Sequence, residues 1–424
     1  MRTIFLAFIA LVAPTLSLCQ QDSIILPEPT TLDINFLIAE ALTNNPEIRA
    51  AELQMDVMAS KVPQVRALDD PELTYMREEM PGFRWDEAMY SKLELMQMFR
   101  FPSKISAQGR IAEIQVEHAH HDHQEKILDV LGTLKSAYYE LWFLQQNMVL
   151  NQENIRLMNQ FSSIALTKYR VAQISQQDVL KAHIELAMLN NEQISLRQQE
   201  LSAKAMLMAI LNRAPKDTLG FAIIPDELSL VGSLDSLQRI ALQVRPMLRH
   251  DSLTIVEAEA MRSLAKQEYI PDMKLGLEYV TGPVDGFRGW TVRAGITLPF
   301  SPWTLGKASA RTDEANATIK RTTASYDASR NMVISSVSNL YYKAEAGKRR
   351  LDTYRMAIIP QARQSLTASL TGYETGRTDF LMLIDAYRTY VNLTKEYFMT
   401  RMQFEQTVAL LEREVGVQDV STLK

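Results

Sequence analysis

The sequence predicts a mainly α-helical protein with a membrane β segment and an internal duplication. Three observations predict this fold class. Short motifs recur in the same order in both halves of the chain, long stretches carry apolar residues at heptad-like spacing, and two pairs of short stretches alternate apolar and polar residues. The first pattern indicates a repeat, the second indicates long helices packed as coiled-coil-like hairpins, and the third indicates β-strands.

The duplication divides the chain into a first repeat at residues 20–214, a linker at 215–232 and a second repeat at 233–424. Each match is short, but all of them occur in a common order, which favours a repeat over coincidence. The matches are "ALTNNPEIR" (41–49) with "ALQVRPMLR" (241–249), "GFR" (82–84) with "GFR" (286–288), "YY" (138–139) with "YY" (341–342), and Tyr169 with Tyr373.

Residues 1–19 are typical of a secretory signal peptide, because Arg2 precedes an apolar run too short to span a bilayer. Cleavage before Gln20 would remove Cys19, the only cysteine. Lipidation of Cys19 is the alternative, but Leu18 stands where a bacterial lipobox has a small residue. In both cases the mature chain is exported and has no disulfides.

A short helix is expected to open each repeat, with capping regions at Leu32-Asp33 and Leu234-Asp235. Long helices are expected at about 103–213 and 303–416, because the first of these stretches has no proline and is rich in helix formers. Helices of this length must pack as hairpins. Apolar residues at heptad-like spacing are Ile127, Val130, Leu134, Ala137, Leu141, Leu144 and Met148.

Turn residues place the tips of these hairpins. In "YETGRTDF" (373–380), Gly376 indicates a turn, and Thr378 and Asp379 are candidates for the N-cap of the next helix. The counterpart in the first repeat has Ala172 where Gly376 stands and Ser175 at the possible cap.

Strands are expected at about 72–80, 88–98, 273–281 and 290–298, and each is close to the length of a transmembrane β-strand. Four strands cannot enclose a pore, and open strand edges are not tolerated in lipid. Three copies of the chain would supply a closed, twelve-stranded barrel. A soluble arrangement that buries the apolar strand faces against helices is the alternative.

Composition excludes other classes. The chain is 46% hydrophobic and 22% charged, as in folded proteins, and its net charge of −5 gives no basic field for nucleic acid. No nucleophile elbow, phosphate loop or metallohydrolase motif is found. We therefore expect no enzyme, no cofactor and no nucleic-acid partner.

The opening "LIAEALTNNPEIRAAE", the duplicated plan and the turn "YETGRTDFLMLIDA" resemble the TolC family of bacterial outer-membrane efflux proteins across nearly the whole mature chain. "DDPELTYMREEMP" and "QMFRFPSKISA" are similar to its heavy-metal branch, with Ser103 in place of a glycine. The resemblance implies a homotrimer, with a twelve-stranded barrel in outer-membrane lipid continued by a periplasmic α-barrel.

The resemblance further implies a passive conduit for heavy-metal cations, working with a periplasmic adaptor protein and an inner-membrane pump of the RND type. The same conduit for drugs or for type I protein secretion is the alternative within this class. A periplasmic coiled-coil scaffold or adaptor without a pore is the alternative from another class.

The family closes its periplasmic aperture with residues just past each hairpin turn, and the matching positions here are Asp178, Tyr373 and Asp385. Thr378 occupies the family's arginine position, with Arg377 beside it. The resemblance thus implies a gate made of Asp178, Tyr373, Arg377 and Asp385. Without it, these would be solvated turn residues, since Asp is common near helix starts.

The segment "EHAHHDHQ" (117–124) holds four of the six histidines, His118, His120, His121 and His123. On a helix His118 lies near His121, and His120 near His123. Such a pair can share Zn²⁺ or Cu²⁺ if a third ligand comes from a neighbouring helix or subunit. A hydrophilic helix face is the alternative.

Overall fold

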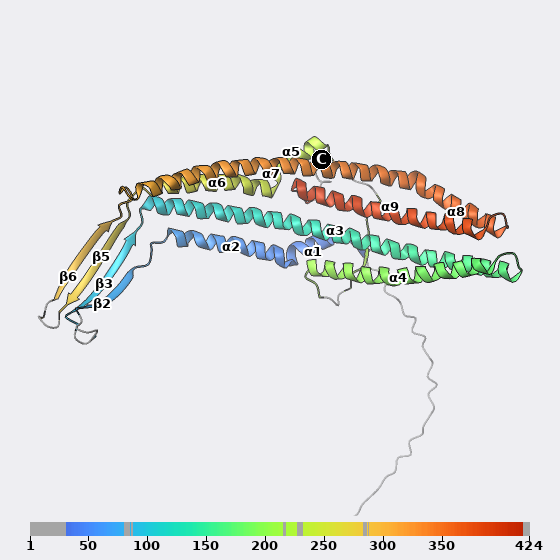
Figure 1. The fold of residues 1–424 in the computed structure, drawn as a ribbon, viewed down its shortest axis with the longest axis horizontal. Helices are drawn as coiled ribbons and strands as arrows, with labels where there is room; N and C mark the ends of the chain where they lie inside the picture. Colours follow the sequence, from blue (N-terminus) through green and yellow to red (C-terminus); the bar gives the residue numbers. More distant parts are fainter. Residues whose placement is uncertain are drawn as a thin grey trace, which may run out of the picture.

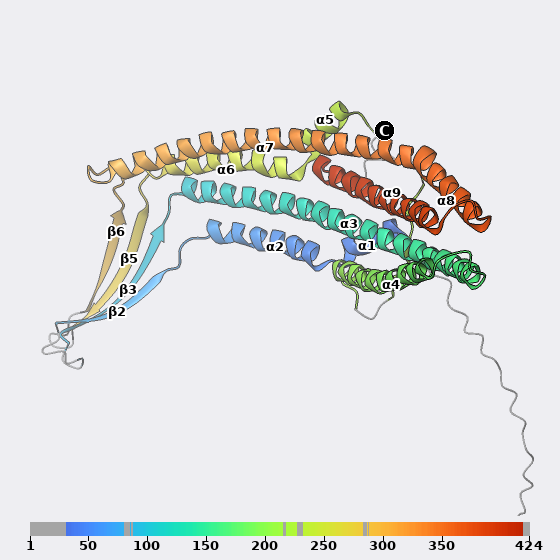
Figure 2. The same cartoon turned by 45° about the vertical axis from the view of Figure 1, so that its right-hand side comes forward.

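The computed structural model (Figure 1) describes residues 31–79, 85, 88–214, 218–226, 232–282, 286 and 288–418. The predicted signal peptide with Cys19, residues 215–217 and 227–231 of the predicted linker and the first "GFR" lie outside the described residues. The described chain is a long rod with the four strands at one end and the turns of the two long helical hairpins at the other, as Figure 2 also shows.

The two repeats have the same order of elements: a short helix, a longer helix, two strands and a long helical hairpin. In the first repeat these are α1 (Ile34–Asn44), α2 (Pro46–Arg66), β2 (Glu72–Glu78), β3 (Tyr90–Phe99), α3 (Pro102–Arg170) and α4 (Gln176–Ile210). In the second repeat they are α5 (Leu234–Val244), α6 (Pro246–Gln267), β5 (Met273–Thr281), β6 (Arg288–Ile296), α7 (Leu305–Thr353), α8 (Ile359–Glu374) and α9 (Phe380–Val415). A π-helical turn at Tyr354–Ile358 joins α7 to α8.

Local sequence sets the ends of the opening helices. The Asp33 side chain accepts a hydrogen bond from the backbone N–H of Asn35 and caps α1. In the second repeat the cap is Ser233, one residue before the predicted region, and Asp235 lies in the first turn, where the helix dipole favours an acid. A proline starts each following helix, where its missing N–H costs no hydrogen bond.

The four strands form one antiparallel sheet in the order β2-β3-β5-β6. Its register aligns Leu73, Leu95, Leu277 and Val292 in one row across all four strands, and the next row is Thr74, Glu94, Glu278 and Thr291. Because successive side chains point to opposite faces, the sheet has an apolar face and a polar face. The period-two prediction of strands is confirmed, and β2 and β6 each have an unpaired edge in the single chain.

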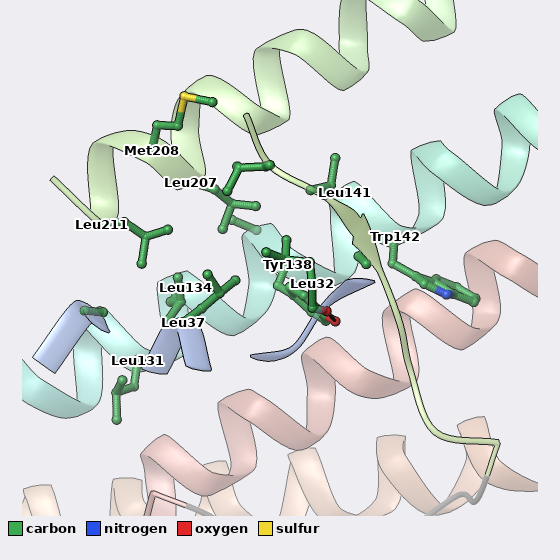
Figure 3. Packing of buried hydrophobic residues seen from close by; sticks show 14 residues of the cluster. Leu32, Leu37, Leu131, Leu134, Tyr138, Leu141, Trp142, Leu207, Met208 and Leu211 are labelled. Atoms are coloured by element: carbon green, nitrogen blue, oxygen red, sulfur yellow. Dashed lines mark hydrogen bonds between the residues drawn. The ribbon is translucent and has the colours of Figure 1, made fainter. Parts of the chain in front are cut away.

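A core halfway along the rod fixes the start of the chain to α3. Two two-residue strands, β1 (Thr31–Leu32) and β4 (Phe221–Ala222), pair in parallel. The buried Tyr138 hydroxyl lies 2.7 Å from the carbonyl oxygens of Leu32 and Ile223, and it accepts a hydrogen bond from the Ile223 N–H (Figure 3). Burial raises the pKa of Tyr138 to about 12. Leu134 and Leu141, two of the predicted heptad positions, are fully buried beside it.

Candidate functional site

The apolar face of the sheet is exposed. In its central row Leu73 is 66% exposed and Val292 is 76% exposed, so helices do not cover this face and the soluble alternative does not apply. An uncovered apolar surface on paired strands is suited to contact with lipid. The other large residues of the face are Tyr75, Leu93, Leu95, Phe99, Met273, Leu275, Leu277, Tyr279, Trp290 and Ile296.

The polar face carries a buried charge cluster. Glu94 and Glu278 lie directly opposite each other on β3 and β5, and both side chains are nearly fully buried. Arg293 of β6 binds both carboxylates, with 2.7 Å to Glu94. Two adjacent buried carboxylates repel each other unless a cation lies between them, so Arg293 stabilises this part of the sheet.

The described helices do not match a membrane-spanning helix in length and hydropathy. No described helix is both long enough and apolar enough to cross a membrane. The long helices instead carry polar and charged residues along their length.

The turns of both hairpins meet in one apolar core at the far end of the rod. It contains residues from α3, α4, α8 and α9, so the two repeats pack against each other where the helices turn back. We call this the tip core. Its buried members are Met158, Phe161, Ala165, Val179, Ala182, Leu189, Leu366, Tyr373, Phe380, Leu383, Ile384, Tyr387 and Val391.

Tyr373, a predicted gate residue, lies inside the tip core and is only 1% exposed. Its ring packs on Phe380, with 5.6 Å between ring centroids. Lys168 of the first hairpin donates a hydrogen bond to the Tyr373 carbonyl oxygen, and its Nζ lies 4.8 Å from the ring centroid. The hydroxyl is buried and has no hydrogen-bond partner among the described residues. Burial, and then the charge of Asp178, raise the pKa of Tyr373 to about 12.

The other predicted gate residues lie at the surface of the two turns. Arg377 and Asp385 are exposed, and Asp178 is half-buried at the start of α4. Among the described residues of the single chain, these three form no ion pair, so the structure does not bring Arg377 to either acid.

Two ion pairs that the sequence did not predict join the hairpins just behind the tips. Glu185 of α4 pairs with Arg388 of α9, and one heptad further along Glu192 pairs with Lys395 at 2.5 Å. The members of each pair are 203 residues apart in the chain, one less than the 204 that separate Ser175 from Asp379, so they lie one residue away from equivalent positions of the two repeats.

The four predicted histidines do not form one group. His118 contacts α6, where the His250 ring lies 4.3 Å away between centroids and a Glu257 carboxylate oxygen lies 3.4 Å from Nε2. The His120 and His121 rings are 5.6 Å apart, and both residues contact Gln124. In this conformation, no three His, Cys, Asp or Glu side chains of the described residues are placed to hold a metal ion together.

A sequence model described as outer membrane efflux protein matches residues 37–213 and, a second time, residues 237–417. The chain belongs to the outer membrane efflux protein family. The two matches fall on the two repeats of the efflux protein, which confirms both the predicted family and the predicted duplication.

The efflux protein is 21% identical to the cobalt-zinc-cadmium resistance protein CzcC of Cupriavidus metallidurans, over 98% of this chain and 100% of that protein. Its fold is similar to the crystal structure of CusC, with a TM-score of 0.77 and 14% identity over 96% of this chain and 99% of that chain. It is also similar to the outer membrane protein VceC of Vibrio cholerae, with a TM-score of 0.72 and 17% identity over 91% and 96% of the two chains.

Family membership relates the two faces of the sheet to the location of the protein. The efflux protein is a channel of the outer membrane, and its family and structural neighbours are channels. The two faces of the sheet fit this location: the exposed apolar face is suited to lipid, and the polar face with its Glu94–Arg293–Glu278 cluster is suited to water. The rod of helices extends from the strands into the periplasm.

Proposed function

We propose that three copies of the efflux protein form the outer-membrane conduit of a tripartite pump that exports heavy-metal cations. A periplasmic adaptor protein and an inner-membrane pump of the RND type would bind at the hairpin end and supply the energy. The conduit itself is passive and needs no cofactor.

The observation that carries the trimer is the four-stranded sheet with two open edges and one lipid-facing side. Unpaired backbone groups at a strand edge cost several kcal/mol each in lipid, so β2 and β6 must pair with neighbouring copies. Three sheets give twelve strands, an even number within the range of outer-membrane barrels.

The gate of this conduit would lie at the tips. Asp178, Arg377 and Asp385 have no ion-pair partner within the described chain, and threefold symmetry would place their copies around one opening. Charges at a narrow opening lower their energy by pairing with opposite charges of the neighbouring copies. Tyr373 would contribute indirectly: buried in the tip core, it would fix the position of the turn that carries Arg377.

The barrel can be tested with one pair of substitutions on β6. Val292→Arg puts a charge on the lipid face and should destabilise the barrel by about 2–4 kcal/mol, whereas Thr291→Arg puts the same charge on the polar face and should be tolerated. Heat resistance of the assembled trimer on gels measures the difference. Equal losses from both variants would contradict the assignment of the two faces.

The cargo can be tested by measuring cell-associated cobalt, zinc, cadmium, copper and silver in a deletion strain and in the strain restored with the native chain. The relation to CzcC supports a metal cargo, so deletion should raise the content of one or more of these metals and the native chain should lower it again. The Val292→Arg chain serves as the control with a destabilised barrel. Unchanged content of every metal would overturn the metal assignment and leave a conduit for another cargo.

A further inference from the structure

The polar contact between α3 and α6 is the feature that the conduit does not explain. These two helices come from different repeats and lie side by side in the helical rod, in the part next to the sheet (Figure 1, Figure 2). Their contact contains two imidazoles and a carboxylate, His118, His250 and Glu257, where a seam between amphipathic helices usually has apolar side chains.

His118 is the centre of this contact. Its side chain is 12% exposed. Nε2 has only the long 3.4 Å contact with Glu257, and Nδ1 is buried with no hydrogen-bond partner among the described residues. An unpaired buried polar group costs about 1–3 kcal/mol, and neither the fold nor the proposed conduit compensates this cost at Nδ1.

The spacing of the donor atoms indicates what it binds. Glu257 Oε2 lies 3.4 Å from His118 Nε2. Ligands at about 2.0–2.2 Å from a tetrahedral zinc ion lie about 3.3–3.5 Å from each other. The Gln115 side chain donates a hydrogen bond to the other carboxylate oxygen of Glu257, at 3.0 Å, and holds it in this position.

His250 supplies a third donor. Its ring lies against that of His118, and its nitrogens are 3.6 Å from Asp122 on one side and from Asp251 on the other. These long contacts are weak, so a rotation of the half-buried His250 ring toward Glu257 breaks no good hydrogen bond. Two neutral imidazoles and a carboxylate are the ligand set of many zinc sites that keep a fourth position for water.

We propose that His118, His250 and Glu257 bind one divalent transition-metal ion of the zinc class in each chain, with His250 turning to complete the site. The site joins the two repeats below the membrane. It goes beyond the proposed conduit, because an ion held between α3 and α6 can be present whether or not metals are the cargo.

The test uses the purified full chain in detergent, titrated with Co²⁺ and Zn²⁺ at pH 7. We expect one saturable site per chain, with the strong visible absorption of four-coordinate Co²⁺ that Zn²⁺ abolishes. His118→Gln, His250→Gln or Glu257→Gln should each weaken binding at least about 100-fold, which is the upper end of the loss from changing a supporting residue. The matched control is His120→Gln with His121→Gln and His123→Gln on the same helix, which should leave binding unchanged.

Two results would overturn the proposal: no saturable binding by the native chain, or an equal loss of binding in the control. Glu257→Gln preserves size and polarity, so it answers the question even if a histidine variant fails to assemble. Binding without any change in cellular metal content would support this site and refute the metal cargo. A change in cellular metal content without saturable binding by the purified chain would refute this site and leave the metal cargo supported.

Discussion

The two hairpin tips have the same backbone shape but different residues. Ala172 in the first tip and Gly376 in the second both have left-handed backbones, with φ of 56° and 78°. Ser175 and Asp379 both occupy the N-cap of the following helix, but only Asp379 accepts the capping hydrogen bond, from the Met382 N–H at 2.8 Å. The second tip therefore has the residues that its turn requires, and the first does not.

This difference indicates that tertiary packing, and not the local turn residues, stabilises the conformation of the first tip. The ordinary cost of a left-handed alanine is about 1–2 kcal/mol, and no side-chain cap offsets it. The first tip is instead attached to the second through Lys168 on Tyr373 and through the common tip core. Loss of contact between the hairpins should loosen the first tip more than the second.

The largest expected effect comes from the two tyrosines that the duplication relates. Tyr373→Ala removes a ring from the tip core and should destabilise both tips by about 3–5 kcal/mol, as for other buried aromatics. Tyr169 is 42% exposed, and Tyr169→Ala should cost less than about 1 kcal/mol. Hydrogen exchange of the amides in the tips measures both losses.

Tyr373→Phe is the control for this pair, because it keeps the ring and removes a hydroxyl that has no partner. We expect no loss of protection from it. Similar losses from Tyr373→Ala and Tyr169→Ala would contradict the comparison, because the exposed Tyr169 would then support the tips as much as the buried Tyr373 does.

A smaller effect is expected from exchanging the two turn residues. Gly376→Ala should destabilise the second tip by about 1–2 kcal/mol, because a side chain is strained at this φ. Ala172→Gly should stabilise the first tip by up to about 1 kcal/mol, since relief of strain exceeds the added flexibility of the unfolded chain. Hydrogen exchange of each tip measures the change, and effects of the same sign would contradict the comparison.

Substitutions of the two N-cap residues should differ in their effect on stability by about as much as the substitutions of the two turn residues. Asp379→Ala removes an observed capping bond and should cost about 1 kcal/mol at the start of α9. Ser175→Ala removes a hydroxyl that makes no capping bond and should leave α4 unchanged. Exchange rates of the first-turn amides measure both. A loss from Ser175→Ala equal to that from Asp379→Ala would show that the first tip is capped in solution.

The smallest effect is expected from the ion pairs behind the tips. Arg388→Ala should cost about 0.2–1 kcal/mol, because Arg388 is largely exposed, and the loss should shrink as salt is added. Arg377→Ala removes a neighbouring exposed arginine that has no ion-pair partner in the described chain, and it should have no effect on the isolated tip. Salt-independent losses would indicate that packing, and not charge, joins α4 to α9.

Much of the fold could be predicted from local sequence. The strands can be predicted because one face of the sheet is apolar and the other polar, so apolar and polar residues alternate with the period of the backbone. The turn at Gly376 and the cap at Asp379 were found because few residues tolerate these conformations. The repeat was found because a duplicated plan leaves matching residues in matching order.

The contacts between distant segments could not be predicted in the same way. A long helix shows which of its faces is apolar, but it does not show which helix will cover that face. Tyr373 matched an aperture position, yet it is buried because Lys168 and Phe380 enclose it. The partners of His118 lie on α6 in the other repeat, and the spacing of the histidines along their own helix carried no information about them.

The sequence by itself determined the elements, their duplication, the two faces of the sheet and the family. Each of these depends on residues that are near one another in the chain, or on a pattern repeated within it. Only the tertiary structure decided that the two repeats join through the tip core, through Glu185–Arg388 and through His118 with Glu257. The physical reason is that side chains from separate helices interact through space, and their distance along the chain does not encode which of them meet.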